Sequence, residues 1–370
     1  MSDNADQVRT KTTIVDVARE SGVSYATVSR VLNGDVHVKP KTRERVQQAM
    51  ERLGYVVNRQ ARSLAGGHSH VIGVLVPDLG TGYIGEIMRG IDEELDLAHY
   101  DMMLHTTHRR EAKESSYVAT LTQGMADGLL IVLPRNPATF MQTLRQRNFP
   151  YVLIDHQGTN EQDHAVGATN WQGAYNATEY LIKLGHQRIG FITGSMDLGC
   201  ARDRLAGYQA ALRAHHLSFD SKQVYEGDFH QPDGYAGANR LLENQVRPTA
   251  IFAANDVMAM SAMEAVREHS LRVPEEVSIL GFDDIPQAAH VHPALTTVRQ
   301  PLGQMGRVAT QMLVDLLNNP DAKPRRIELP TELVIRGSCQ APLSCEKQGQ
   351  QKEDRDHQWS APFIVSVPGQ

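Results

Sequence analysis

Residues 16–34 read DVARESGVSYATVSRVLNG, and this stretch decides what kind of fold stands near the start of the chain. In its second half, apolar side chains recur at helical spacing, at Val28, Val31 and Leu32, and are expected to point inward. The opposite side of that short helix is left to four residues, namely Tyr25, Ala26, Ser29 and Arg30. Three of these four side chains are polar, which indicates that this face of the helix meets a polar surface.

Start and stop signals around this stretch predict three short helices. Residues 13–16 have the form of a capping box, and Gly22 suits the left-handed position that ends a first helix. Ser24 can cap the second helix, Pro40 suits the first turn of a third, and Gly54 ends it. Three short helices with a tight glycine turn between the first two predict a helix-turn-helix.

The charge of the chain is unevenly distributed. Residues 12–66 carry nine basic and five acidic side chains, a net charge of +4, whereas the whole chain has a net charge of −6. A small basic head on a large acidic body is expected if only the head meets phosphates, although a solvated basic helix would have the same charge.

Bulk composition excludes several other classes of protein. The 370 residues contain no apolar run near the length of a membrane span, and the polar first dozen residues predict no secretory signal. Cys200, Cys339 and Cys345 are scattered, which favours reduced thiols in the cytoplasm over a disulfide framework. The histidines form no zinc-type cluster, so we expect neither a metal nor a cofactor.

Beyond Val71 the pattern changes to alternating short apolar runs and helical segments. The first series of runs is VIGVLVP, DMMLHTT, GLLIVLP and YVLID, and the second is RIGFITG, VYEGDF, TAIFAAND and VSILGFDD. Helical patterns separate them, which predicts α/β architecture with two doubly wound lobes. The late segments TTVRQP and LPTELVIRGS are expected to be extended and to cross back between the lobes.

Eight motifs, in order from Thr12 to Ser338, resemble the LacI/GalR (lactose-repressor) family of bacterial transcription regulators. They are TIVDVARESGVSYATVSRVLNG, TRERVQQAMERLGYVVNRQARSLAG, IGVLVPD, LIKLGHQRIGFITG, DRLAGYQAAL, FAANDVMAMSAM, VPEEVSILGFDD and LTTVRQP. The resemblance implies a small all-α helix-turn-helix head, joined by a hinge helix to a two-lobe α/β effector domain of periplasmic-binding-protein type. We expect a disordered N-terminus at 1–11, the head at 12–57, the hinge helix at 58–67, the effector-binding and dimerisation domain at 70–340, and a disordered tail at 341–370.

The resemblance also implies a homodimer that binds a pseudo-palindromic, double-stranded operator in the bacterial nucleoid. The candidate DNA contacts are Tyr25, Ala26, Thr27, Ser29, Arg30, Asn58, Arg62 and Leu64. Arg30 can pair bidentately with guanine, and the hydroxyls of Thr27 and Ser29 suit phosphate oxygens. Leu64 corresponds to the family's minor-groove wedge, with Asn58 and Arg62 facing the backbone. Packing of Tyr25 on the third helix, a solvated Arg30, and packing of Leu64 on its dimer mate remain alternatives.

By position, the resemblance implies an effector pocket between the lobes, at the carboxyl ends of the strands. Its candidate residues are Tyr83, Asp155, Arg204, Phe229, Asn255 and Asp283, with Asn170 as a weaker one. Carboxylate, amide and guanidinium groups with an aromatic face suit a sugar or a sugar derivative. Caps, a salt bridge and core packing are the structural alternatives for these residues. Tyr83 lies in LGTGYIGE, which departs from the family's Asn-Pro-Phe-like turn.

The function implied is a repressor of carbohydrate-utilisation genes that a small molecule releases from its operator. The sign of the ligand response stays open, as does a tetramer, although the tail lacks a leucine heptad and favours a dimer. A sugar-binding receptor without a DNA role would need a signal peptide and no basic head. An enzyme is not expected, because GxxxxGK[ST] and GxSxG motifs are absent from the sequence.

Overall fold

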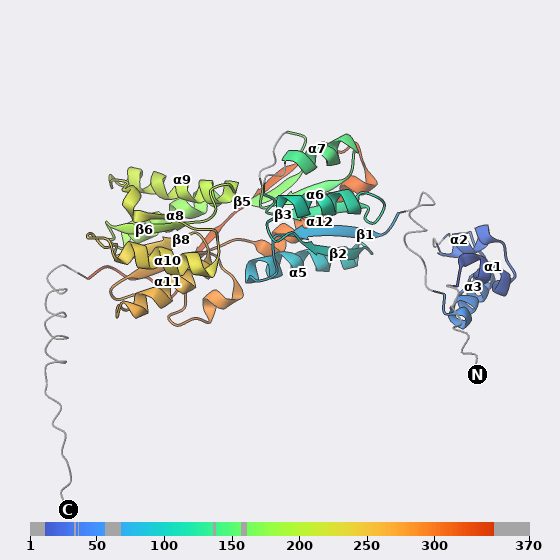
Figure 1. The fold of residues 1–370 in the computed structure, drawn as a ribbon, viewed down its shortest axis with the longest axis horizontal. Helices are drawn as coiled ribbons and strands as arrows, with labels where there is room; N and C mark the ends of the chain where they lie inside the picture. The colour runs from blue at the N-terminus through green and yellow to red at the C-terminus, as the bar shows by residue number, and fades with distance from the viewer. Residues whose placement is uncertain are drawn as a thin grey trace, which may run out of the picture. The chain divides into compact units, whose positions relative to one another are not determined.

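The structure is a computed structural model that describes residues 12–32, 35, 37–55, 68–135, 138–156 and 161–343. The chain divides into two compact units between Ser69 and His70 (Figure 1). The expected disorder of residues 1–11 and 344–370, and the expected hinge helix at 58–67, lie outside the described residues. No helix in the described ranges is long and apolar enough to span a membrane.

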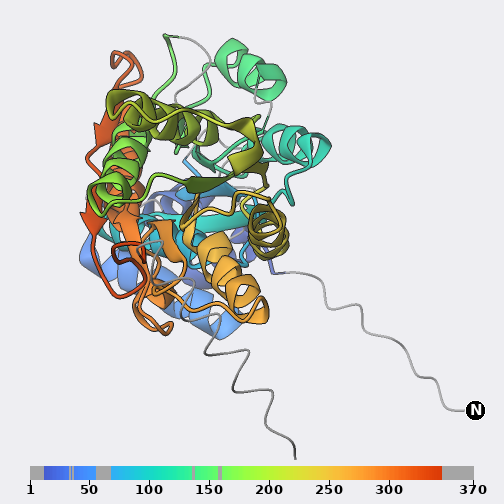
Figure 2. The same ribbon diagram turned by 90° about the vertical axis from the view of Figure 1, so that its left-hand side faces the viewer.

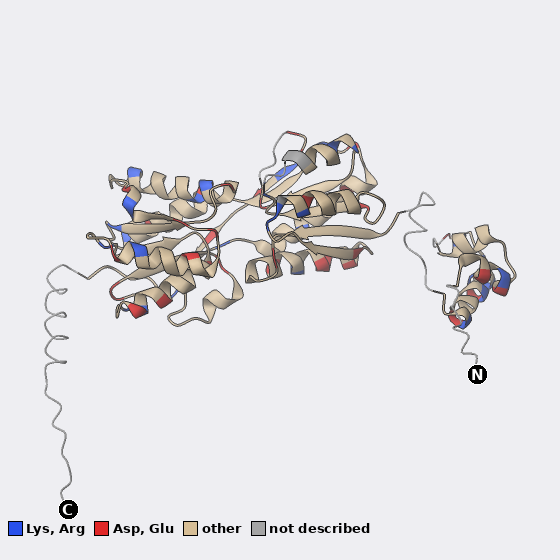
Figure 3. Cartoon of the chain, in the orientation of Figure 1, with Lys and Arg blue, Asp and Glu red and all other residues tan. Residues whose placement is uncertain are grey.

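The first unit contains the three predicted helices, α1 (Ile14–Ser21), α2 (Tyr25–Leu32) and α3 (Pro40–Leu53). One apolar residue from each, Val17, Val28 and Val46, is completely buried in their shared core. Figure 3 marks the positions of both basic and acidic residues along the ribbon of this unit. Because this core is small, the unit also depends on the hydrogen bonds that cap its helices for stability.

The predicted caps of these helices are confirmed. The Thr13 backbone N–H donates to the Asp16 carboxylate at 2.9 Å, and the Asp16 N–H donates to the Thr13 hydroxyl at 3.4 Å. Gly22 and Gly54 end α1 and α3 with φ of 64° and 58°. Lys39, which precedes α3, makes no side-chain cap, so Pro40 alone marks the start of that helix.

The first lobe of the second unit is built on a six-stranded, wholly parallel sheet in the order β11-β5-β4-β3-β1-β2. Its strands are β1 (Val71–Val76), β2 (Asp101–Thr106), β3 (Gly128–Val132), β4 (Tyr151–Ile154), β5 (Ala165–Ala168) and β11 (Arg326–Leu329). Its helices are α5 (Gly82–Leu97), α6 (Glu111–Leu121), α7 (Ala138–Gln146) and α12 (Leu302–Asn318).

Helices cover both faces of this sheet (Figures 1 and 2). The reason is the two-residue period of β1, whose successive side chains point to opposite faces. Val74 and Val76 pack in one cluster with Ile87 of α5, whereas Leu75 packs in another with Leu121 of α6. A strand buried on both sides reads as a continuous apolar run, as VIGVLV does.

The second lobe holds another six-stranded sheet, in the order β12-β10-β9-β8-β6-β7, in which only the β10–β12 pair is antiparallel. Its strands are β6 (Ile189–Thr193), β7 (Val224–Glu226), β8 (Ala250–Ala253), β9 (Ser278–Asp283), β10 (Thr296–Arg299) and β12 (Glu332–Val334). Its helices are α8 (Asn170–Lys183), α9 (Gly199–Ala214), α10 (Gln231–Leu242), α11 (Asp256–Glu268), and the 3-10 turns η1 (Ser221–Gln223) and η2 (Pro286–Ala289).

The chain passes between the lobes three times. It leaves the first lobe after β5, returns between β10 and α12, and leaves again between β11 and β12. The expectation that TTVRQP and LPTELVIRGS cross between the lobes is therefore confirmed. Two of the crossings are tied together, because the hydroxyls of Thr169 and Thr331 lie 3.0 Å apart.

Three elements of the first lobe were not expected from the sequence: β5, β11 and α12. The two strands have only four residues each, and a run such as AVGA carries too little pattern to be recognised. Helix α12 does have an apolar stripe, which we did not identify. Its place in the first lobe depends on packing against α5, where a Cβ on Gly90 would lie 1.9 Å from the Gly303 carbonyl oxygen.

Candidate DNA-binding face and effector pocket

Helix α2 presents the predicted contact face to solvent. Tyr25 is 53% exposed, so packing of its ring into the core is not what the structure shows. Ala26 and Arg30 are also exposed, and Ser29 is half-buried beside them. The apolar side of the same helix holds Val28, which is completely buried. This helix therefore has one core side and one open, polar side.

Thr27 differs from the other residues predicted on this face, because its hydroxyl already has a partner. Its oxygen lies 2.9 Å from the Ser24 hydroxyl, and its backbone N–H donates to that same Ser24 oxygen at 3.2 Å. Ser24 thus caps α2 as predicted, and Thr27 takes part in the cap. The predicted contacts Asn58, Arg62 and Leu64 lie outside the described residues.

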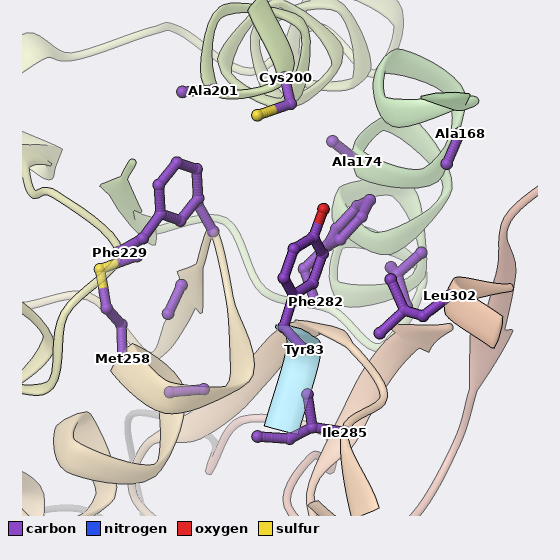
Figure 4. Close-up of a cluster of buried hydrophobic side chains, with 14 of the residues drawn as sticks. Tyr83, Ala168, Ala174, Cys200, Ala201, Phe229, Met258, Phe282, Ile285 and Leu302 are labelled. Carbon is purple, nitrogen blue, oxygen red and sulfur yellow. The ribbon is translucent and has the colours of Figure 1, made fainter. Parts of the chain in front are cut away.

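In the second unit, the six predicted effector residues come together around one pocket between the lobes. They are Tyr83, Asp155, Arg204, Phe229, Asn255 and Asp283. The sequence reasoning missed seven more lining residues: Pro77, Asp78, Thr81, Ile84, Arg109, Leu133 and Cys200. Figure 4 shows Tyr83, Phe229, Phe282 and Cys200 around this space. No group of His, Cys, Asp or Glu side chains suited to a metal occurs within the described ranges.

Arg204 is the central cation of the pocket and is 2% exposed. Its Nε donates to the Asn170 side-chain oxygen at 2.8 Å, and one terminal nitrogen donates to the Ala254 carbonyl oxygen. The guanidinium also lies over the Phe282 ring, 3.8 Å from the ring centre, and 3.6 Å from the Asp283 carboxylate. These contacts fix the group in one orientation, since a planar guanidinium offers its donors in a rigid fork.

Asn170 connects the cation with a carboxylate on the other side of the pocket. Its amide nitrogen lies 3.4 Å from an oxygen of Asp155, while its oxygen accepts from Arg204. The second oxygen of Asp155 accepts a hydrogen bond from the Tyr83 hydroxyl at 2.8 Å. The sequence ranked Asn170 as a weak candidate; in the structure it is buried and positions two of the stronger ones.

Asp283 is an acid that burial makes difficult to ionise. Burial raises the pKa of its carboxyl to about 7, against the opposing effect of Arg204 and of a 2.8 Å hydrogen bond from Gln300. Asp256 lies behind it, completely buried, and desolvation with the nearby Asp283 charge raises the pKa of Asp256 well above its ordinary value. The pocket is thus richer in acids than in cations.

Asn255 and Phe229 hold each other in place. The Asn255 side chain caps α11 by accepting from the Met258 N–H at 2.9 Å, and its amide nitrogen donates to the Phe229 carbonyl at 3.0 Å. The capping role considered for Asn255 is therefore confirmed, although the residue also lines the pocket. The Phe229 ring lies against Gly194, where a Cβ would come within 1.9 Å of it.

Several lining residues share an unusual backbone conformation that the sequence does not signal. Five non-glycine residues around the pocket have positive φ: Arg109 (56°), Leu133 (45°), Asp155 (54°), Phe229 (63°) and Asp283 (111°). All five lie at or just after the carboxyl end of a strand. Left-handed backbone is costly for such residues and is concentrated at functional sites.

At the rim of the pocket, ion pairs join the two lobes. Arg109 contacts Asp228 across the lobes at 3.2 Å, and Asp78 of its own lobe at 3.8 Å. Arg135 also contacts Asp228, and it lies 3.3 Å from Asp197. We call these five residues the rim cluster. The sequence reasoning missed it, although Arg109 closely follows the predicted run DMMLHTT and Asp228 lies near the end of the predicted run VYEGDF.

A helix-turn-helix unit followed by a two-lobed α/β unit with a buried polar pocket defines a class, the ligand-responsive DNA-binding proteins. The comparisons with known proteins agree. Residues 13–58 match the family model described as bacterial regulatory proteins, lacI family, and residues 178–339 match a periplasmic binding protein-like domain. The HTH-type transcriptional repressor PurR of Klebsiella pneumoniae (strain 342) is 34% identical over 88% of this chain and 96% of its own.

Solved structures give the same result. The lac repressor dimer bound to operator and the anti-inducer ONPF superposes with a TM-score of 0.79 at 30% identity, over 90% of this chain and 100% of its own. The complex of the transcriptional regulator CelR with cellobiose does so with a TM-score of 0.70 at 33% identity, over 88% and 99%. The chain belongs to the LacI family. It is a DNA-binding transcriptional repressor with a small-molecule effector domain, and its relatives are repressors, not enzymes.

Proposed function

We propose that this repressor binds a pseudo-palindromic operator as a homodimer, and that a sugar or a sugar-like molecule in the pocket between the lobes controls that binding. The observation that carries the proposal is the convergence of six side chains, predicted from separate motifs, on one buried pocket: Tyr83, Asp155, Arg204, Phe229, Asn255 and Asp283. The protein is expected to act on nucleoid DNA in the cytoplasm. Its scattered cysteines suit a reducing compartment, and its basic head suits DNA.

On DNA, the exposed side of α2 enters the major groove. Arg30 reads a guanine through two parallel hydrogen bonds, and Tyr25 and Ala26 touch base edges or the backbone. Ser29 and the capped N-terminus of α2 at Thr27 face phosphate oxygens. Beyond the head, Asn58 and Arg62 contact the backbone and Leu64 wedges between base pairs, as the family resemblance implies.

In the pocket, an effector with several hydroxyl groups is the best match to the lining. Asp155 and Asp283 accept hydrogen bonds, Arg204 donates them, and the Phe229 ring covers the apolar face of a sugar. The complex of the related CelR with cellobiose supports this ligand class. The effector acts by changing how the lobes close, which alters the presentation of the two heads to the operator.

A homodimer is supported by the edge of the first sheet. β2 is an edge strand whose outer backbone groups have no neighbouring strand within the described sheet, and Leu104 on it is 36% exposed. On α5, which packs against β2, Leu97 is 73% exposed. Long, partly apolar edges are normally covered, and a second copy of this chain would cover this one.

The test is to mix the purified protein with sheared genomic DNA at moderate salt, recover the bound fragments and sequence them. An enriched inverted repeat upstream of a few genes is the expected result. Binding of that repeat is then measured with a panel of monosaccharides and disaccharides that includes cellobiose. Recovery of DNA without any shared sequence would contradict the operator proposal, and a panel in which no member weakens or strengthens operator binding would contradict the sugar proposal.

A further inference from the structure

The pocket between the lobes leaves little free space among its lining side chains. Its cavity volume is ≈ 40 Å³, enough for about three water molecules and far below the few hundred Å³ of ordinary ligand sites. A wider, open hollow of ≈ 670 Å³ adjoins it and shares Pro77, Asp78, Thr81 and Arg109 with it. A ring-shaped effector can approach through this hollow, but it cannot enter the inner pocket as it stands.

Tyr83 is one of the side chains that line the inner pocket and restrict its volume. It is only 8% exposed, and its hydroxyl donates to the Asp155 carboxylate at 2.8 Å. In Figure 4 its ring stands between Phe229 and Leu302, with the hydroxyl directed toward the helix that carries Cys200. The phenol thereby occupies an acceptor oxygen that a ligand would otherwise use.

The phenol of Tyr83 has the properties expected of a ligand for this pocket, namely an uncharged hydroxyl donor on a flat ring. Three carboxyl groups line the pocket, those of Asp78, Asp155 and Asp283, against the guanidinium groups of Arg109 and Arg204. Arg109 is already paired with Asp78 and Asp228, so an added acid would meet excess negative charge. A neutral hydroxyl donor on a flat ring avoids that repulsion. Burial and the nearby carboxylates raise the pKa of Tyr83 well above its ordinary value, so its hydroxyl keeps its proton.

Tyr83 is also placed where it can leave without disrupting a lobe. It is the second residue of α5, directly after the Thr81–Gly82 helix start, and Thr81 borders the open hollow. The residues that anchor α5 in the core, Ile87 and Ile91, come later in the helix. We therefore expect rotation of the Tyr83 side chain to move its ring outward while the helix stays docked.

We propose that Tyr83 is a built-in stand-in for the effector: its phenol holds the place of an uncharged, ring-shaped, hydroxyl-bearing ligand, which must displace it from Asp155 to bind. This inference rests on the proposed function of the same pocket. It adds a ligand class, which excludes sugar phosphates and sugar acids, and an internal competitor that lowers the affinity for every effector.

The first test needs no effector. Tyr83→Ala should leave a site for p-cresol, which is the tyrosine side chain as a free molecule. At saturation, p-cresol should raise the melting temperature of the full-length variant by about 2 °C and leave wild type unchanged. Toluene, which lacks the hydroxyl, should have a smaller effect. A folded Tyr83→Ala protein that ignores p-cresol would overturn the proposal.

The second test keeps the ring, so it does not depend on the folding of the alanine variant. Tyr83→Phe frees Asp155 and should bind an operator-releasing sugar, with cellobiose tried first, roughly tenfold more tightly by calorimetry. The matched control is Tyr151→Phe, because the Tyr151 hydroxyl donates to the Asp163 carboxylate at 2.6 Å outside the pocket. This control should leave affinity unchanged.

The outcomes separate the two proposals. Weaker sugar binding by Tyr83→Phe would mean that the hydroxyl contacts the bound effector, and unchanged binding would mean that it only packs; either result overturns the stand-in. A releasing sugar should also compete with p-cresol for Tyr83→Ala, and tighter binding of glucose 6-phosphate than of glucose would contradict the neutral class. If no sugar weakens or strengthens operator binding, the proposed function fails, whereas the p-cresol result still decides whether the pocket holds a phenol.

Discussion

At the scale of single residues, Arg30 and Arg204 show how one side chain type serves two environments. Arg30 is exposed at the end of α2, free to pair with a base edge. Arg204 is buried, and two of its donors are committed to Asn170 and Ala254. Both residues are arginine, so their different roles are indicated only by the surrounding sequence. Arg30 lies on the polar side of an amphipathic helix, and Arg204 lies within a motif of the second lobe.

Arg30→Ala should weaken specific operator binding by roughly 1–3 kcal/mol per half-site and relax the preference at one base pair, because a bidentate contact is lost. The measurement is a competition titration against operator variants at fixed salt. Arg52→Ala is the matched control, since Arg52 has the same charge but lies in α3, paired with Glu20 at 3.1 Å. Equal losses in both variants would show that Arg30 contributes charge only.

At the scale of elements, the contact between α5 and α12 determines how the first lobe closes. The two helices pass so closely at Gly90 and Gly303 that no side chain fits between their backbones. Glycine is usually unfavourable inside a helix, so a glycine retained there has a packing reason. The close approach also explains how α12, distant in sequence, completes a lobe begun by β1.

Gly90→Ala should lower the free energy of unfolding by about 2 kcal/mol or more, because its Cβ would overlap the Gly303 carbonyl oxygen. Urea denaturation measures the change. Gly85→Ala, in the same helix, is the control: nothing lies within 4 Å of its Cβ, so a gain of about 0.5–1 kcal/mol is expected. A stabilised Gly90→Ala would contradict the close packing described above.

A buried histidine fastens three elements of the second lobe. His186, after α8, has one ring nitrogen 2.9 Å from the Thr249 hydroxyl and the other 2.9 Å from the Gln340 carbonyl oxygen. Since a carbonyl only accepts, the nitrogen facing Gln340 carries the proton and the ring is neutral. Burial lowers the pKa of His186 to about 4, which makes protonation a cost to the folded state.

His186 should make stability depend on pH below neutrality. Its folded-state pKa lies below the unfolded value near 6.5, so its contribution is complete above pH 6.5 and is lost as the pH falls toward 4. At pH 5.5 the loss is about 1 kcal/mol. Urea titrations at pH 7.5 and 5.5 should show a smaller difference in His186→Gln than in wild type or in His269→Gln, an exposed control; an unchanged difference would refute the assignment.

At the scale of the whole effector unit, the rim cluster and the pocket act on the same movement. Arg109 and Arg135 reach across the lobes to Asp228, and Asp228 directly precedes Phe229 in the pocket wall. Any ligand that shifts Phe229 therefore acts on the ion pairs that hold the lobes together. Because coupling between two sites is reciprocal, the operator must change the affinity for the effector by the same factor by which the effector changes the affinity for the operator.

Asp228→Asn should open the lobes of the ligand-free protein, since two guanidinium groups lose their shared carboxylate. We expect a larger radius of gyration by small-angle scattering, approached by wild type as salt is raised. Asp315→Asn is the control, because Asp315 pairs with Arg325 at 2.8 Å within the first lobe. Wild-type dimensions in Asp228→Asn at all salt concentrations would show that the ion pairs do not hold the lobes closed.

Features that depend on residues close together in the chain follow directly from the amino-acid sequence. The caps of α1 to α3, the polar side of α2 and the alternation of apolar runs with helices all arise from residues a few positions apart, where hydrogen bonding and helical period act locally. The six pocket residues were predicted from the family resemblance, which places the pocket at the carboxyl ends of the strands.

Only the tertiary structure decided the rest. Arg109 and Asp228 are 119 positions apart, and no local pattern pairs them. The direction of the Tyr83 ring and the return of α12 and β11 to the first lobe likewise depend on packing between distant segments. Left-handed backbone at Asp155 and Phe229 is stabilised by surrounding contacts, not by residue type. These features result from long-range contacts, which a sequence pattern records only weakly.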